Sequence, residues 1–167
     1  MLQLISIVLV IYSYFQIQSA IPTLPRVIPT HFNPAGVADG WGSPETLWIL
    51  LGAQVLTSAV FLTVPYLGLW RPSLVHFGRR RLSDFTPAQQ ARLIPMLKDM
   101  SGLLSIVANL FFVYLLRQII RATQPIPHLH VLWPMTLLVG GTLGITLIYL
   151  QRFYRTAQDG SHDDVTP

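Results

Sequence analysis

The residues best suited to chemistry lie in one stretch, 22–46, that is rich in proline and glycine. His31, Asn33 and Asp39 supply an imidazole, an amide and a carboxylate close together in the chain. Such a set could bind a peptide, an ion or a protein partner. His31 and Asp39 could instead hydrogen-bond the loop backbone and hold the turn closed, and the surrounding prolines and glycines favour this structural role. The sequence leaves both interpretations open.

A metal site is a weaker interpretation of the histidines. His31, His128 and His130 are expected on the same side of the protein, and three imidazoles could ligate zinc. Their spacing is loose, however, and no carboxylate lies near His128 and His130 in the sequence. The chain has no cysteine, which excludes disulfides and thiolate-bound metals. We therefore predict no metal site and no cofactor.

Patterns typical of enzymes are missing from the sequence. Outside its polar C-terminal tail it contains no paired carboxylates, and it has no glycine-rich phosphate loop and no His-Glu-x-x-His motif. We predict that the protein is not an enzyme. Its net charge is +4, but the basic residues flank apolar runs and do not cover a polar face, so nucleic acid is not an expected partner.

The apolar runs predict the fold class. Hydrophobic residues make up 51% of the 167 residues and charged residues only 11%, whereas soluble domains carry roughly 25% charged residues. About 20 apolar residues cross a bilayer as a helix. The sequence therefore predicts an all-α membrane protein with four transmembrane helices in a single domain over residues 1–155, and a flexible polar tail at 156–167. The expected spans are about 2–20, 46–70, 100–120 and 131–150.

Lysine and arginine counts predict the orientation. Six lie between the second and third spans, two follow the fourth span, and three lie on the opposite side. By the positive-inside rule, both termini are expected in the cytoplasm and the loops 21–45 and 122–130 outside. The centres of the spans contain no ionisable side chain, which disfavours an ion-coupled transporter. The first run lacks a basic start and has Gln18 before Ser19-Ala20, so it is expected to be an anchor and not a cleaved signal peptide.

The inner loop contains the cluster Arg79-Arg80-Arg81, which we expect to attract anionic lipid headgroups. Thr86 and Gln89 have the spacing of a capping box, with proline between them at the first helical position. This pattern predicts a short helix on the inner membrane surface, whose Leu93, Ile94 and Leu97 dip into the lipid. Pro95 should then bend the chain toward the third span.

Small and polar residues within the spans are candidates for helix packing. Ser101, Ser105 and Asn109 recur at four-residue spacing in the third span. Gly140, Gly141 and Gly144 give the fourth span a small-xxx-small pattern, which lets helix backbones approach closely. These faces could pack within the bundle or bind another membrane protein.

Proline and glycine should also shape the outer loop. Asn33 to Gly36 and Asp39-Gly40 have turn chemistry, and Phe32 and Trp41 suit the headgroup layer. Pro22, Pro25 and Pro29 should keep the start of this loop extended. Ser43 is expected to cap the second span, with Pro44 at its first position.

The stretch around Pro25 to Ser43 reads Leu-Pro-x-x-Ile-Pro-x-His-Phe-Asn-x-x-Gly-x-x-Asp-x-Trp-Gly-Ser. It resembles the hallmark of the domain-of-unknown-function 1648 family, a module that also forms the N-terminal part of bacterial Sdp-type immunity proteins. Residues 71–74, 86–87 and 116–121 look like those of its stand-alone four-helix members. Pro44 departs from the pattern, since relatives often have lysine there. The motif residues, binding or structural, are Pro29, His31, Phe32, Asn33, Gly36, Asp39, Trp41 and Gly42.

The resemblance implies a location in the bacterial cytoplasmic (inner) membrane but no reaction. Two functional hypotheses follow. The protein could be a small accessory subunit of a larger membrane complex, possibly an energy-transducing one, bound to other subunits and to membrane lipids. Alternatively, it could be an immunity or signalling protein whose outer loop binds a toxin or peptide. Sdp-type proteins have further C-terminal helices, which weakens the second hypothesis.

Overall fold

Four long helices dominate the computed structural model, which describes residues 2–33, 35–77, 79–122 and 132–159. Each of the four is long and apolar enough to cross a membrane. The prediction of a membrane protein with four transmembrane helices is therefore confirmed. The helices are α1 (Leu2–Ala20), α2 (Thr46–Trp70), α3 (Pro87–Arg121) and α4 (Leu132–Asp159).

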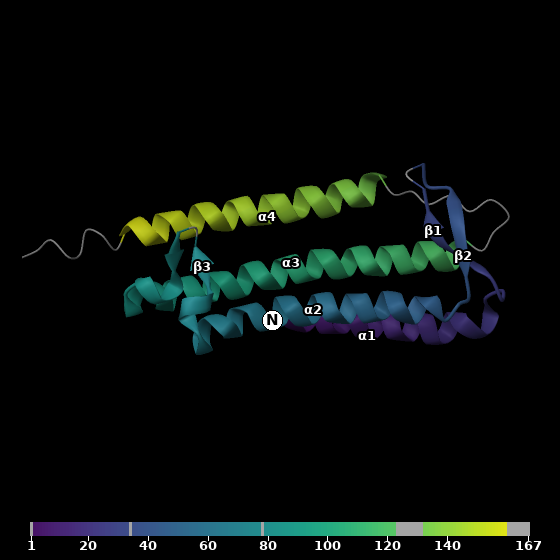
Figure 1. Cartoon of the computed structure of the whole chain (residues 1–167), viewed down its shortest axis with the longest axis horizontal. Helices are drawn as coiled ribbons and strands as arrows, with labels where there is room; N and C mark the ends of the chain where they lie inside the picture. The colour runs from purple at the N-terminus through teal and green to yellow at the C-terminus, as the bar shows by residue number, and fades with distance from the viewer. Residues whose placement is uncertain (1, 34, 78, 123–131, 160–167) are drawn as a thin grey trace, which may run out of the picture.

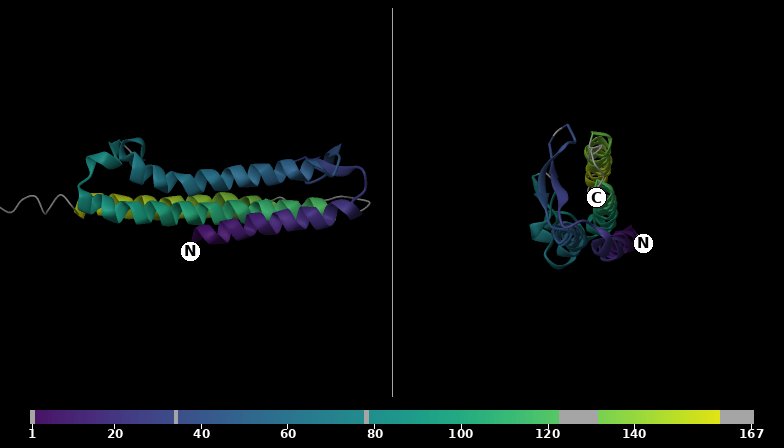
Figure 2. Two further views of the ribbon diagram at one scale, coloured as in Figure 1. Left: turned by 90° about the horizontal axis from the view of Figure 1, so that it is seen from below. Right: turned by 90° about the vertical axis from the view of Figure 1, so that its right-hand side faces the viewer.

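The helices run side by side along the long axis of the molecule (Figure 1). Seen end-on, α1 and α2 lie next to each other, α3 packs on both, and α4 lies on the far side of α3 (Figure 2). Helix α3 is therefore the centre of the bundle. Helix α4 is its least covered member, with 11% of its most apolar window buried.

Charged residues on α3 mark where the hydrocarbon layer should lie. No charged residue occurs between Asp99 and Arg117, a separation of about 27 Å along a helix axis. This length matches a hydrocarbon core of about 30 Å. Trp70 near one end of the bundle and Trp133 near the other fit the aromatic belts of membrane proteins.

Short strands occupy the two ends. At one end, which we call the hairpin end, β1 (Ile28–Phe32) pairs antiparallel with β2 (Ala38–Gly42). At the other, the basic end, β3 (His76–Phe77) pairs with β4 (Arg80–Arg81). The described connections also contain short 3-10 helices, namely η1 (Ile21–Thr23), η2 (Pro72–Leu74) and η3 (Leu82–Asp84).

The loop after α1 differs from its prediction in two places. Asp39-Gly40 lies within β2 and is not a turn. Pro22 belongs to η1 and not to an extended entry, because a proline φ angle also suits the first turn of a helix. Turn-forming residues predicted a compact loop, but they did not reveal that its two halves pair as strands.

Helix α3 corrects the prediction for the inner loop. The Thr86–Gln89 capping box is present, with the Gln89 amide donating to Thr86 Oγ1 over 3.3 Å. However, the helix does not stop at Pro95 but continues to Arg121 and is 35 residues long in all. A proline removes only one helical N–H donor, and Leu93 and Leu97 on either side of it are buried in protein.

Those leucines do not dip into lipid, and Ile94 is only partly buried against the same cluster. The structure shows instead a small apolar core at the basic end, which joins the start of α3 to the end of α4. Its buried residues are Leu82, Phe85, Leu93, Leu97, Tyr149 and Phe153.

Two helix ends also differ from expectation. Helix α2 begins at Thr46, after a turn in which the Thr46 amide donates to the Ser43 carbonyl over 3.1 Å. Ser43 is therefore not its N-cap. Helix α4 extends to Asp159, so the first residues of the predicted flexible tail are helical. The remainder of that tail, 160–167, lies outside the described residues.

Candidate functional site

The β1–β2 hairpin brings His31 and Asp39 together on its exposed face. His31 Nδ1 lies 2.5 Å from Asp39 Oδ1, and the two side chains are 74% and 45% exposed. The pairing register is irregular on both sides of His31, as in a β-bulge, which re-aims side chains. The pair leaves Nε2 of the imidazole and one carboxylate oxygen available to a ligand.

Gly40 is required by this arrangement. It lies opposite His31 in the hairpin, and a Cβ atom at position 40 would be only 2.7 Å from the His31 Cβ. Any larger residue would push the strands apart. One glycine of the loop is therefore explained by close packing and not by turn geometry.

Asn33 and Gly36 form the turn of the hairpin, as predicted. Asn33 Oδ1 accepts hydrogen bonds from the backbone amides of Ala35 and Val37, each 3.0 Å long. Gly36 has a φ of 79°, a conformation that glycine adopts without strain. Asn33 therefore has a structural role in the loop, whereas His31 and Asp39, which were expected to bond the backbone, pair with each other.

The base of the hairpin is anchored in the helices. Ile28 is fully buried with Ile17, Leu47 and Leu116, one residue from each of α1, α2 and α3. Pro29 is also buried, while Phe32 and Gly42 are partly buried. Trp41 remains 56% exposed. The base of the hairpin is thus held by the helices, while Trp41, His31 and Asp39 remain exposed.

A histidine-rich metal site is not visible in the part of the chain that the structure describes. His128 and His130 lie outside the described residues. Among the described ones, no three histidine, aspartate or glutamate side chains come together.

The polar residues of the third span lie at the α2–α3 interface. The Asn109 amide nitrogen donates to Ser58 Oγ over 2.9 Å and to the Ser105 carbonyl over 2.8 Å. Gln54 Nε2 donates to Asn109 Oδ1 over 2.9 Å, and Ser101 donates to the Phe61 carbonyl. Gln54 and Ser58 were not predicted as packing residues, although their four-residue spacing within an apolar run was a usable signal.

The glycines of α4 divide into two groups. A Cβ at Gly141 would lie 3.7 Å from Val107 of α3, whereas Cβ atoms at Gly140 and Gly144 would meet nothing within 4 Å. Gly141 therefore faces α3. No described residue fills the space beside a Cβ at Gly140 or Gly144.

The arginines at the basic end have different surroundings. The guanidinium of Arg80 lies 4.4 Å from the centre of the Phe85 ring and donates to the Asp84 carbonyl. The backbone amide of Arg81 donates to the Asp84 carboxylate. Arg79 is exposed and makes no such contact with described residues. Arg80 therefore has a structural role, and Arg79 and Arg81 present their side chains outward.

These features define a multi-pass membrane protein with a structured hairpin at one end and a basic surface at the other. Residues 1–55, which comprise α1, the hairpin and the start of α2, match the model of the family described as Domain of unknown function (DUF1648). The matched residues include the Pro25 to Ser43 stretch, from which the resemblance to this family was predicted. Comparisons with curated proteins and with solved structures found no match.

Proposed function

We propose that the protein is a non-enzymatic accessory subunit of a larger assembly in a bacterial cytoplasmic membrane. The observation that carries the proposal is the open face of α4. This helix packs mainly on α3, and Cβ atoms at Gly140 and Gly144 would meet no described residue within 4 Å. Small residues at four-residue spacing let a second helix approach closely. The occupant of this face is a transmembrane helix of another subunit.

In this proposal the basic end faces the cytoplasm and the hairpin faces outward. Eight of the 11 lysines and arginines lie at or near the basic end, in agreement with the positive-inside rule. Both termini are then cytoplasmic. The arginines meet anionic headgroups there, and the rigid hairpin is available to an outward-facing part of the assembly.

The test is co-purification from native membranes in a mild detergent. We expect the protein to migrate with other subunits at constant stoichiometry, and Gly140→Leu with Gly144→Leu to release it. The matched control is Gly52→Leu, because a Cβ at Gly52 on α2 also meets nothing within 4 Å. A lone protein in every detergent, or equal release by the control, would reject the proposal.

A second candidate function is recognition of a toxin or peptide by the hairpin. It is favoured by the exposed His31–Asp39 pair beside the exposed Trp41, since an aromatic side chain next to polar groups is typical of binding hot spots. Replacing His31 or Asp39 by alanine should then sensitise cells to a peptide, while Thr30→Ala should not. Equal sensitivity of all three variants would reject this role.

A further inference from the structure

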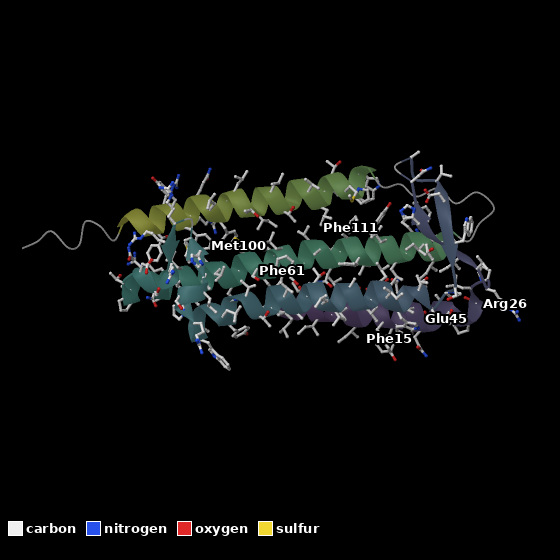
Figure 3. All side chains as sticks on the ribbon, viewed as in Figure 1. Phe15, Arg26, Glu45, Phe61, Met100 and Phe111 are labelled. Carbon is white, nitrogen blue, oxygen red and sulfur yellow. The ribbon has the colours of Figure 1, made fainter. Side chains whose placement is uncertain are left out.

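A groove between α3 and α4 opens near the hairpin end. Its volume is about 250 Å³. Leu110, Phe111 and Tyr114 contribute to its wall from α3, and Trp133 and Leu137 contribute from α4. Phe111 lies between the two helices (Figure 3). The lining is apolar and aromatic, so the groove suits hydrocarbon.

The groove reaches the edge of the hydrocarbon layer. Tyr114 and Trp133 meet edge-to-face there, with ring centres 5.2 Å apart. Tryptophan and tyrosine prefer the level of the lipid headgroups. A hydrocarbon chain in the groove would therefore have its polar end just beyond this aromatic pair.

Two arginines continue the α3 side of the groove toward the membrane surface. Residues 110, 114, 117 and 121 share one face of a helix because they recur at three- and four-residue intervals. Arg117 is about 4.5 Å beyond Tyr114 along the helix axis, and Arg121 about 10 Å beyond it. Both arginines are exposed. Neither forms an ion pair with an acidic residue in the described part of the chain.

We propose that this groove is a binding site for an acidic phospholipid of the leaflet at the hairpin end. One acyl chain lies against Leu110, Phe111 and Leu137, and the phosphate lies at Arg117, with Arg121 adding charge. Charge complementarity selects this occupant, because a purely apolar partner helix would leave both guanidinium groups without an anion. On α4, Leu137 lies three and seven residues before Gly140 and Gly144 and therefore on the same helix face, so the site adjoins the proposed subunit contact. Arg117→Gln changes only α3 and tests the lipid site separately from that contact.

Native mass spectrometry of the full chain in detergent tests the proposal. The probes are phosphatidylglycerol and phosphatidylcholine with identical acyl chains. We expect phosphatidylglycerol to bind more tightly, and Arg117→Gln to weaken it about fivefold, the effect of one basic residue near an anionic headgroup. The control is Arg26→Gln, which removes an exposed arginine at the same end of the molecule (Figure 3).

A second pair of variants tests the acyl-chain groove. Leu137→Trp fills the groove and should reduce binding of phosphatidylglycerol. Leu143→Trp adds the same bulk at a position on α4 that is 58% exposed and outside the groove, so it should not. Equal retention of the two lipids, or equal effects of Arg117→Gln and Arg26→Gln, would overturn the proposal. Loss of binding only in variants with a lowered melting temperature would also overturn it.

Discussion

Gln54 on α2 and Asn109 on α3 are joined by a 2.9 Å hydrogen bond within the membrane-spanning part of the bundle. Both side chains are at most 2% exposed. Ser58 and Ser105 complete the network, so the Asn109 amide has partners on both its oxygen and its nitrogen. An amide in this position is stable in lipid only when it is fully hydrogen-bonded.

Asn109→Leu should therefore destabilise the α2–α3 interface. We expect the free energy of unfolding to fall by about 1–2 kcal/mol, the range for polar contacts between membrane helices. Unfolding in mixed micelles with increasing dodecyl sulfate would measure it. Thr146→Val is the control, because the Thr146 hydroxyl donates only to the Thr142 carbonyl of its own helix. Equal losses in the two variants would contradict an interhelical role.

Gly40→Ala should open the β1–β2 hairpin, since the added methyl group would overlap with the Cβ of His31. Overpacking of this kind costs about 1–3 kcal/mol. Hydrogen exchange of the strand amides should become faster by the factor that corresponds to this loss of free energy. The double variant Gly40→Ala with His31→Gly should restore slow exchange. Fast exchange in the double variant would show that the close contact is not the cause.

Glu45 should titrate below its ordinary range. Hydrogen bonding by the Ser43 side chain, and then by the Glu45 backbone, lowers the pKa of this carboxyl group. The contribution of ionised Glu45 to the stability of the fold is therefore present above the unfolded-state pKa. It is lost as the pH falls through the folded-state pKa. Glu45 is the single glutamate of the sequence, so selective carboxyl labelling gives one NMR signal. Ser43→Ala should raise the pKa, and an unchanged titration would contradict the assigned cause.

Replacing Arg79 or Arg80 by alanine removes the same charge but should have different effects on the stability of the protein. Arg80→Ala removes the contact with Phe85 and the bond to Asp84, and should reduce stability by about 0.5–1 kcal/mol. Arg79→Ala removes an exposed side chain and should leave the melting temperature unchanged. Thermal unfolding in detergent compares the two variants. A lower melting temperature for Arg79→Ala than for Arg80→Ala would contradict the assignment.

The sequence predicted the four spans well because lipid imposes one simple requirement, a long uncharged helix. It did not predict contacts that depend on how the helices pack. The partners of Asn109 became visible only when α2 and α3 were placed together. Pro95 was expected to bend the chain between a short surface helix and the third span, but one helix runs through it. Leu93 and Leu97 are held there by Tyr149 and Phe153, which lie far away in the sequence.

The hairpin illustrates the same limit. Asn33 and Gly36 were identified as turn residues because their chemistry is local. The contact between His31 and Gly40 depends on strand register, which turn residues alone do not reveal. The difference between Gly141 and its neighbours Gly140 and Gly144 likewise depends on the placement of α4 against α3.

We propose that the four helices cross a bacterial cytoplasmic membrane with the hairpin outside and the basic end inside. The chain has no cysteine, so single cysteines at exposed positions report their own location. Ala35→Cys lies in the hairpin, and Ala88→Cys lies in the first turn of α3. In intact spheroplasts, a membrane-impermeant maleimide should label Ala35→Cys alone, and should label Ala88→Cys only after permeabilisation. Labelling of Ala88→Cys in intact spheroplasts would contradict the account.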